Sequence, residues 1–343
     1  MLLKKNRDKN LSSNYRPISC MGKVYERIIK NALDSATARQ NIIPPIHSGF
    51  RRGRSTQENF YRLTEGIPEG FKQNKVTIGA FVDLNKAFDA VHQDSLRVRL
   101  LRQRLPAKLT RTISSFLRDR YLYVAEGDVN SEEILMLGGT PQGSIQSPTL
   151  FILLSADAPV VSDGIEEDGS IFADDINMWA TAKNLNDCIP LIQRRINIFA
   201  EWCDRWRFSP SPPKLKVVIF TKKRKMRNDA KKRSIYMNNS KISWAQEVTF
   251  PGTICKNLDF KSHIDGLIHK SYVKTKSIRK LCQFGISIDQ DIVISLIHSL
   301  FFSAFHYSAP TYLGMSPLIW GKINSFFSRT FLATLALLKM NWS

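Results

Sequence analysis

Apolar residues in this chain fall into short continuous runs and longer runs with helical spacing. The stretch V-T-I-G-A-F-V at 76–82 is continuous and predicts a buried strand. The stretch V-V-I-F at 217–220 predicts a second strand. The stretch S-I-F-A-D-D-I-N-M-W at 170–179 predicts a strand, a turn and a returning strand. Its adjacent carboxylates, Asp174 and Asp175, need an explanation, because burying two like charges together costs free energy.

Helical spacing marks three further segments and the end of the chain. Within residues 13–34, an extended start is followed by G-K-V-Y-E-R-I-I-K-N-A-L at 22–33, which predicts a helix whose apolar face carries Val24, Ile28, Ile29 and Leu33. Residues 95–120 predict a basic amphipathic helix, and residues 184–207 a helix with Ile189, Ile192, Ile196, Phe199 and Trp202 on its apolar face. From about residue 256 onward the pattern is mainly helical. Strands with intervening helices, followed by a helical end, predict an α+β core joined to a helical domain.

Polar segments separate these elements. S-G-F-R-R-G-R-S-T at 48–56 predicts a basic loop that leads into a helix capped by Ser55 or Thr56. Residues 121–137 predict strands around a polar turn, and G-G-T-P-Q-G-S at 138–144 predicts another loop.

The segment 222–233 is the most basic part of the chain, since eight of its twelve residues are Lys or Arg. The simplest interpretation is a solvated loop between strands. A nucleic-acid contact and a nuclear-import signal are the alternatives.

One segment has the length of a membrane span. Residues 292–321 contain no Asp, Glu, Lys or Arg and are long enough to cross a bilayer. They also contain several serines, two histidines and two prolines, and their first half resembles a helix buried against other protein. We therefore expect no membrane partner.

Charge narrows the class of partner. The chain has 343 residues, 43% of them apolar, which is enough for two or three domains with a substantial core. It has 50 Lys and Arg against 30 Asp and Glu, a net charge of +20. Such a balance favours a polyanionic partner, either nucleic acid or an anionic membrane surface. A basic protein without a polyanionic partner is the alternative.

The five cysteines are scattered, without a C-x-x-C pair or the Cys/His spacing of a zinc site. This distribution fits reduced thiols in the cytoplasm or nucleus, and the N-terminal ten residues lack the apolar core of a signal peptide. We expect a nuclear and cytoplasmic protein.

Three carboxylates are candidate metal ligands. Asp83 follows the strand 76–82, and Asp174 and Asp175 lie in the strand–turn–strand unit. If these strands are neighbours in one sheet, the three carboxylates converge and repel one another unless cations lie between them. Carboxylate oxygens suit Mg²⁺, and two such ions clamp the attacking and leaving oxygens in nucleotidyl transfer. For the doublet alone, a solvent-facing hairpin turn is the alternative.

Six segments follow one another in a characteristic order. They are S-N-Y-R-P-I-S (13–19), S-G-F-R-R-G-R-S-T (48–56), F-V-D-L-N-K-A-F-D-A-V (81–91), G-T-P-Q-G-S-I-Q-S-P (139–148), F-A-D-D (172–175) and W-R-F-S-P-S-P-P-K (206–214). In this order and spacing they resemble the reverse transcriptase of non-LTR retrotransposons, the LINE-like and jockey-like elements. The resemblance extends over roughly residues 4–335.

The resemblance implies a right-hand polymerase fold of the α+β class, with fingers, a palm formed by an antiparallel sheet with packed helices, and a helical thumb. It divides the chain into fingers at 1–80, a palm with the metal site and some interspersed finger elements at 81–255, and a thumb at 256–343. The implied activity is that of an RNA-directed DNA polymerase, which extends a DNA primer 3′-OH on an RNA template with dNTPs. The implied cofactor is a pair of Mg²⁺ ions, with Mn²⁺ as a substitute, and the oligomeric state stays open.

The resemblance also implies catalytic residues. Asp83 and Asp174 match the two metal-binding aspartates, and Asp175 matches the second residue of the doublet, which we group with them as a metal ligand. Lys214 matches a lysine that is proposed to donate a proton to pyrophosphate, with an ordinary surface lysine as the alternative. Phe88 matches the steric gate against the 2′-OH of a ribonucleotide, a role compatible with that of a core aromatic residue.

Substrate-binding positions follow in the same way. Gln142 and Gly143 match the loop under the nascent base pair, where glycine lets the backbone approach the substrate closely. Arg16, Arg51 and Arg54 match basic finger positions, and guanidinium groups suit a triphosphate. For each arginine, a template phosphate or a surface ion pair is the alternative.

Several features depart from the family pattern. V-T-F-P-G-T-I at 248–254 resembles the primer-grip hairpin, but Pro251 removes a strand donor and brings the pairing into question. No endonuclease domain precedes the fingers and no C-terminal Cys/His knuckle follows, which predicts a truncated copy, a partial gene product or an excised domain. The alternatives to an active enzyme of this family are a catalytically decayed relic that only binds nucleic acid, and a related polymerase such as a group II intron maturase or a viral RNA polymerase.

Overall fold

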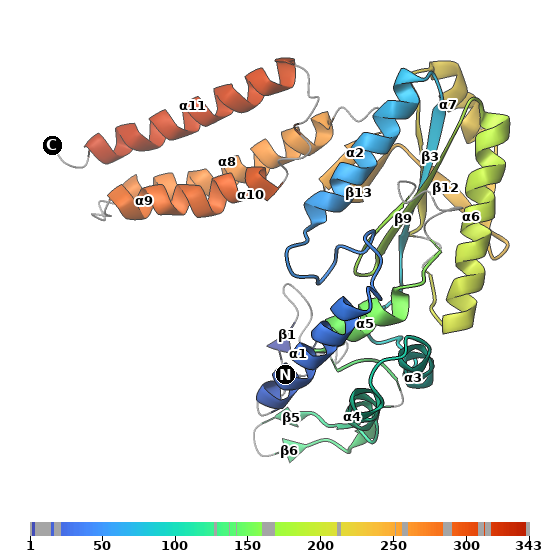
Figure 1. The fold of residues 1–343 in the computed structure, drawn as a ribbon. Helices are drawn as coiled ribbons and strands as arrows, with labels where there is room; N and C mark the ends of the chain where they lie inside the picture. Colours follow the sequence, from blue (N-terminus) through green and yellow to red (C-terminus); the bar gives the residue numbers. More distant parts are fainter. Residues whose placement is uncertain are drawn as a thin grey trace.

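A six-stranded sheet lies at the centre of the computed structural model (Figure 1). The structure describes residues 2–3, 15–16, 22–126, 129–136, 138–141, 143–159, 169–210, 214–250, 252–255, 260–283, 290–307, 312 and 317–340. The strand order is β11–β12–β10–β3–β9–β8. The bounds are β3 Val76–Asp83, β8 Gly169–Phe172, β9 Asp175–Ala182, β10 Lys216–Phe220, β11 Ile235–Met237 and β12 Ser240–Ala245.

All neighbouring strands of this sheet pair antiparallel except β10 and β12, which are parallel. Between them the chain passes through the helix α7, Arg224–Lys231, and the strand β11. A parallel pair needs such a crossover, whereas antiparallel strands can be joined by a tight turn. The predicted α+β class is thus confirmed, with one parallel pair in a largely antiparallel sheet.

Alternation along β3 gives each face of the sheet its own core. Val76, Ile78, Ala80 and Val82 pack in the cluster that contains the helix α6, Leu185–Trp206. Phe81 points to the other face and packs with Trp179 and with Phe60 of the helix α2, Thr56–Lys72. The sheet is therefore covered by α6 on one face and by α2 on the other, as Figure 1 shows.

The predicted helix at 184–207 is confirmed by α6, which buries Ile192, Ile196, Phe199 and Trp202. Asn184 caps it by accepting a hydrogen bond from the backbone N–H of Asp187 at 3.1 Å. The cap predicted for α2 is also present, since the Ser55 Oγ accepts the backbone N–H of Gln57 at 3.2 Å.

Four helices lie near the end of the sheet where β3 ends (Figure 1). They are α1 Lys23–Arg39, α3 Gln93–Arg102, α4 Ala107–Leu117 and α5 Ser147–Ser155. The prediction of a single helix at 95–120 is wrong, because the first helix ends before Arg104, which has a φ of 53°, and a new helix begins after Pro106.

The apolar face predicted for α1 is confirmed for only two of its four residues. Ile29 and Leu33 are buried, whereas Val24 and Ile28 are 75% and 64% exposed because they lie on the opposite side of the helix.

The short strands of the described residues form four two-stranded sheets. β4 Tyr121–Leu122 pairs with β7 Ile134–Leu135, and β5 Ala125–Glu126 pairs with β6 Val129–Asn130 between them, as the pattern at 121–137 predicts. β1 Leu2–Leu3 pairs with β2 Tyr15–Arg16. β13 Glu247–Phe250 and β14 Gly252–Cys255 form an antiparallel hairpin with Val248 opposite Ile254. The strands on both sides of Pro251 thus pair in register, although Pro251 itself lies outside the described residues.

The C-terminal helices form a second body beside α2 and β13 (Figure 1). They are α8 Lys261–Gln283, α9 Gln290–Ile297, a π-helical segment His298–Phe302, α10 Ser303–Tyr307 and α11 Pro317–Met340. They share a small core of Ile264, Phe305, Ile319 and Ile323. Within the described part of the chain, none of the helices combines the length and the apolar character that a bilayer crossing requires. The three-part division of the chain stays a prediction, and its boundary between residues 80 and 81 falls inside β3.

One further prediction is wrong. The basic segment 222–233, expected as a loop, contains α7. Ala230 is fully buried and Met226 packs against the core, so two apolar residues four positions apart hold the segment in a helix despite its charge.

Candidate active site

The strand register brings the predicted aspartates together. Asp83, the last residue of β3, lies directly opposite Asp175, the first residue of β9. Cross-strand partners share a face of the sheet, and the alternation along β3 puts Asp83 on the face of Phe81. Asp174 lies in the turn between β8 and β9, one residue away. The strands are thus neighbours, as expected, and the three carboxylates lie at their adjoining ends. Their role as metal ligands stays a prediction.

The turn that carries the doublet has a left-handed residue. Phe172 and Asp175 close the hairpin, and Ala173 between them has a φ of 56°. An L-residue pays a steric cost there, so surrounding contacts must hold the turn. The backbone N–H of Ser48 donates to the carbonyl of Ile171 at 3.1 Å, and that of Ile171 donates to the carbonyl of Ile46 at 3.1 Å.

Gly49 makes the closest approach to this turn. A Cβ at Gly49 would lie 2.4 Å from the backbone nitrogen of Ala173, a distance that real Cβ atoms do not tolerate. The loop that precedes α2, residues 44–55, is therefore packed directly on the aspartate turn; we call it the finger loop. It was predicted as a basic loop, but its contact with the doublet could not be read from the sequence.

Mutual repulsion and burial perturb the doublet. Burial, together with the charges of Asp174 and Asp83, raises the pKa of the Asp175 carboxyl to about 6. Burial also raises the pKa of Asp174, with Asp83 adding to the rise, while a backbone hydrogen bond and Lys214 lower it. Asp83 and Asp174 are half-buried and Asp175 is exposed, so all three residues are open to solvent at least in part.

Lys214 lies at the same place. Its Nζ donates to the Asp83 Oδ2 at 2.8 Å, and this hydrogen bond raises the pKa of the lysine. Both groups are partly open to solvent, so the pair adds little to folding stability. The structure thus brings together all four of the residues predicted to be catalytic.

The donor set fits a divalent cation chemically. The charge of Asp83 helps to raise the pKa of both Asp174 and Asp175, and the three carboxylates together are a set of hard oxygen ligands whose charge a cation would offset. Among the residues that the structure describes, however, no group of three or more His, Cys, Asp or Glu side chains has the arrangement of a formed metal site. One Asp83 oxygen is engaged by Lys214, so a cation at Asp83 has to displace or share that contact.

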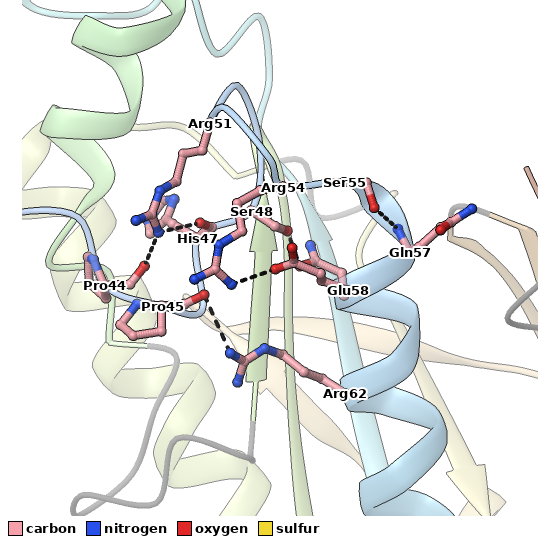
Figure 2. Close-up of polar contacts among 11 residues, drawn as sticks. Pro44, Pro45, His47, Ser48, Arg51, Arg54, Ser55, Gln57, Glu58 and Arg62 are labelled. Carbon is pink, nitrogen blue, oxygen red and sulfur yellow. Dashed lines mark hydrogen bonds and ion pairs between the residues drawn. The ribbon is translucent and has the colours of Figure 1, made fainter. Parts of the chain in front are cut away.

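Figure 2 shows how the arginines of the finger loop are engaged. The Arg51 Nη1 donates to the carbonyls of Pro44 and His47, each at 2.9 Å. Arg54 forms an ion pair with Glu58 at 2.7 Å in the first turn of α2. Both predicted triphosphate ligands thus have local partners that brace the loop, and their role toward a nucleotide stays a prediction.

The third predicted arginine, Arg16, lies in β2, and its side chain is outside the described residues. Arg62 of α2, which the sequence did not single out, donates to the carbonyl of Pro45 at 3.4 Å and ties the same loop to the helix (Figure 2).

Aromatic rings connect the finger loop to the sheet. Phe88 packs on Phe151 of α5 with ring centroids 4.9 Å apart and meets the edge of Phe50 at 5.9 Å. Phe50 also lies 6.5 Å from Phe172, the residue before the aspartate turn. Phe88 is thus a core aromatic with a partly exposed surface, and its role as a steric gate stays a prediction. Phe50 was not among the residues predicted from the sequence. Its position in the motif S-G-F-R, between a glycine and an arginine, was the signal that could have identified it.

The loop predicted to lie under the nascent base pair is held by α1. Gly143 has a φ of 80°, and its carbonyl accepts a hydrogen bond from the Lys23 Nζ. The backbone N–H of Ile145 donates to the Glu26 Oε2 at 2.5 Å. Lys23 and Glu26 were not identified from the sequence, because nothing in their spacing links them to a loop more than a hundred residues away. Gln142 lies outside the described residues.

Comparison with known proteins agrees with this geometry. Residues 3–255 match the family described as reverse transcriptase (RNA-dependent DNA polymerase). A probable RNA-directed DNA polymerase from transposon BS of Drosophila melanogaster is 28% identical over 290 residues, which is 82% of this chain and 32% of that protein. The RNA-directed DNA polymerase from mobile element jockey of the same species is 28% identical over 263 residues, 74% of this chain and 28% of that protein. The chain therefore spans about a third of the length of the curated relatives it matches.

Solved structures of telomerase from Candida tropicalis are also similar. One, in complex with a TWJ fragment of telomeric RNA, has a TM-score of 0.46 and 12% identity, covering 94% of this chain and 56% of that one. The apo form has the same TM-score and identity, covering 93% and 54%. The family match and the fold described above agree with the predicted right-hand polymerase fold, and the relatives from mobile elements agree with the predicted resemblance to jockey-like retrotransposons. Because the match takes in the finger loop, the aspartate turn and Lys214, this chain belongs to the reverse transcriptase (RNA-dependent DNA polymerase) family.

Proposed function

We propose that this chain is an RNA-directed DNA polymerase that adds deoxynucleotides to the 3′-OH of a DNA primer paired with an RNA template. The observation that carries the proposal is the strand register that sets Asp83 opposite Asp175 with Asp174 in the adjoining turn. It lies within a chain whose family and relatives are named for this activity.

In this proposal Asp83, Asp174 and Asp175 hold two divalent cations, Mg²⁺ in the first place and Mn²⁺ as a substitute. The ions, when bound, neutralise charge on the phosphates and lower the pKa of the primer hydroxyl. The protein contributes position: the two strands and the turn fix the carboxylates, and the finger loop packed at Gly49 holds the turn against movement.

In this proposal Lys214 acts as the proton donor. Its ammonium group lies within hydrogen-bond reach of Asp83, so it stands where the reacting phosphates would come. A lysine released from Asp83 by a cation can donate a proton to the leaving pyrophosphate. A lysine ammonium group is protonated at neutral pH, as an acid requires.

Substrate contacts complete the proposal. Arg51 and Arg54 lie in the finger loop beside the aspartate turn, and Phe88 presents part of its ring between Phe50 and Phe151. The triphosphate is expected near the arginines and the deoxyribose near Phe88. Gly143, with left-handed backbone and no side chain, lets the nascent base pair approach its loop.

Primer extension on poly(rA)/oligo(dT) with Mg²⁺ tests the proposal. Wild type is expected to extend the primer, and Asp83→Asn and Asp174→Asn are expected to lose at least about a thousandfold of the rate, because the charged ligands are gone. Asp229→Asn on α7, far from the turn, is the matched control and is expected to keep full activity.

The competing function is a decayed relic that binds nucleic acid without extending it. The observation that favours it is the Lys214–Asp83 ion pair, which engages one ligand oxygen. Folded protein that binds the hybrid with salt-dependent affinity, and never extends the primer with Mg²⁺ or Mn²⁺, would establish that function instead.

A further inference from the structure

The helix α7 presents a row of polar and basic side chains to a pocket at the edge of the sheet. Arg224, Arg227, Asn228 and Lys231 line this pocket, and their spacing of three and four residues puts them on one face of the helix. Trp244 and Gln246, at the end of β12 and beyond it, form the other wall together with Ile219. We call this the α7 pocket.

Charge in the α7 pocket has one sign. The side chains that line it include three cations and no carboxylate among the described residues. Asp229 of the same helix points to the other side, where it pairs with Lys232 at 3.5 Å. Arg224 and Lys231 are exposed, and within the described part of the chain neither has an ion-pair partner. Arg224 and Lys231 therefore give the pocket positive charge that suits an anionic ligand.

The shape of the pocket indicates what kind of anion fits. It encloses about 180 Å³, less than the roughly 300–1,000 Å³ of pockets that enclose a whole small molecule. Trp244 is half-buried, and its Nε1 donates to the carbonyl of Arg233 at 2.9 Å, which fixes the ring. A fixed indole beside several cations suits one base and its flanking phosphates in a longer strand, because bases stack on aromatic rings while phosphates pair with cations.

Position separates this pocket from the candidate active site. β10 ends at Phe220, opposite Thr77 near the start of β3, and α7 follows, whereas Asp83 ends β3. Two walls of the pocket, Ile219 and Trp244, lie level with Ile78 and Ala80 of β3, so Asp83 lies three to five residues further along the strand direction, about 10–17 Å at roughly 3.3 Å per residue. Figure 1 shows α7 at the end of the sheet away from α1 and α5. The α7 pocket is thus built from α7, β10 and the end of β12, none of which carries the three aspartates.

We propose that the α7 pocket binds single-stranded RNA, as a second contact for the RNA strand outside the active site. The choice of RNA rests on the proposed function, since a polymerase that copies RNA always holds an RNA strand with single-stranded parts. The alternative, a nuclear-import signal, would need the basic segment as an accessible extended peptide, whereas Met226 and Ala230 anchor it as a helix in the core.

Binding of a fluorescently labelled 20-nucleotide single-stranded RNA, followed by anisotropy, tests this proposal. Excess unlabelled blunt-ended RNA–DNA hybrid occupies the proposed active site, and EDTA makes the readout independent of catalysis. R224E/K231E is expected to weaken binding about tenfold or more and to reduce the slope of log K against log salt by about 1.4, the value for two lost phosphate contacts on a single strand. K225E/K232E, with the same charge change outside the α7 pocket, is expected to stay within about threefold of wild type.

Substitutions of Trp244 give an independent test of the proposal. Trp244→Leu and Trp244→Phe both lose the hydrogen bond to Arg233, but only Phe keeps a ring on which a base can stack. Trp244→Leu is expected to weaken binding about fivefold or more and Trp244→Phe to keep it. Circular dichroism and thermal unfolding check that each variant is folded, and primer extension on a short template checks that R224E/K231E keeps an intact active site.

Several results would overturn the proposal. Equal losses in R224E/K231E and K225E/K232E would mean attraction to net charge rather than to a site. Unchanged RNA binding in R224E/K231E would also reject the proposal. If the same variant lost importin-α binding, the basic segment would be identified as an import signal. Tighter binding of single-stranded DNA of the same sequence would reject RNA as the partner. Absence of primer extension in wild type would contradict the polymerase function but leave the binding results readable.

Discussion

Gly49 is the residue on which the contact between the finger loop and the aspartate turn depends. Alanine there would place its Cβ 2.4 Å from the Ala173 nitrogen, and both groups belong to backbone that cannot rotate away. We expect Gly49→Ala to cost about 1–3 kcal/mol of stability through overpacking. We also expect it to lower the kcat of primer extension at least about tenfold, because the doublet moves with its turn. Denaturant unfolding and steady-state kinetics measure the two effects.

Gly53 of the same loop is the matched control. It has a φ of 74°, but a Cβ there would meet nothing within 4 Å. Gly53→Ala is therefore expected to cost only the strain of a left-handed residue, about 1 kcal/mol, and to leave kcat within about twofold. Equal kinetic defects in both variants would show that mobility of the loop, not its contact with the turn, controls the rate.

His47 gives the finger loop a dependence on pH. It is 1% exposed, and its Nε2 donates to the carbonyl of Ser155 at 3.0 Å, while its Nδ1 has no hydrogen-bond partner among the residues that the structure describes. Burial lowers the pKa of His47 from 6.5 to about 4. The folded state thus holds fewer protons than the unfolded state between these values. Its stability is full above pH 6.5 and declines as the pH falls toward 4, by about 3 kcal/mol.

Urea unfolding at pH 7 and pH 4.5 checks this expectation against His47→Gln, whose amide can donate to Ser155 without titrating. The wild type is expected to lose more stability between the two pH values than the variant does, since other titrating groups contribute to both. An identical loss in both proteins would show that His47 is not the group responsible.

For single residues, the sequence predicted the candidate catalytic groups but not the residues that hold their loops in place. The aspartates, Lys214 and Phe88 stand in distinctive motifs, so their types and order predict a role. Lys23, Glu26 and Phe50 act through contacts with Gly143, Ile145 and Phe88 that depend on how distant segments pack. No local pattern encodes such contacts.

Among elements, the strands were predicted best. β3 and β10 are continuous apolar runs buried on both faces, and their bounds differ from the predicted ones by one residue. α7 was missed because its charge outweighs two apolar residues, and the face of α1 was misplaced because Val24 and Ile28 are apolar but unburied. Local periodicity gives the type of an element, whereas the face it buries depends on its neighbours.

The C-terminal helices form an element group with a core of their own. Phe305 is 3% exposed, packs with Ile264, Ile319 and Ile323, and has its ring centroid 4.9 Å from that of Phe327. Phe305→Ala is expected to cost about 3–5 kcal/mol within this core and to leave the sheet intact, because the sheet has separate clusters. Hydrogen exchange by mass spectrometry would show faster exchange in α8 and α11 and unchanged exchange in β3.

Phe199→Ala, in the core beneath the sheet, is the matched change. It is expected to raise exchange in β3 and β9 and to spare α11. If Phe305→Ala raised exchange in β3 as much as in α11, the helices and the sheet would unfold as one cooperative unit.

For the whole molecule, the net charge of +20 and the three converging carboxylates act in opposite directions on a nucleic acid. The basic surface attracts the phosphates, while the aspartates repel them where the primer end must lie. We expect the affinity for an RNA–DNA hybrid to fall steeply with salt, with a log–log slope of about −4 or steeper if five or more phosphates are contacted. We also expect D83N/D174N/D175N to bind the hybrid more tightly than wild type in EDTA, because the repulsion is removed.

Divalent ions are expected to reverse the order of the two hybrid affinities, so that wild type binds more tightly than the triple variant. With Mg²⁺ present, wild type gains cations between its carboxylates and the phosphates, whereas the triple variant has lost these ligands. Titrations of labelled hybrid in EDTA and in Mg²⁺, each at 50–200 mM KCl, separate the two contributions. A nearly flat salt dependence would mean that the basic surface does not contact phosphates, and equal affinities of the two proteins in EDTA would mean that the primer end does not approach the aspartates. The combination expected here, attraction spread over the molecule and repulsion confined to one turn, makes productive binding depend on the metal rather than on charge alone.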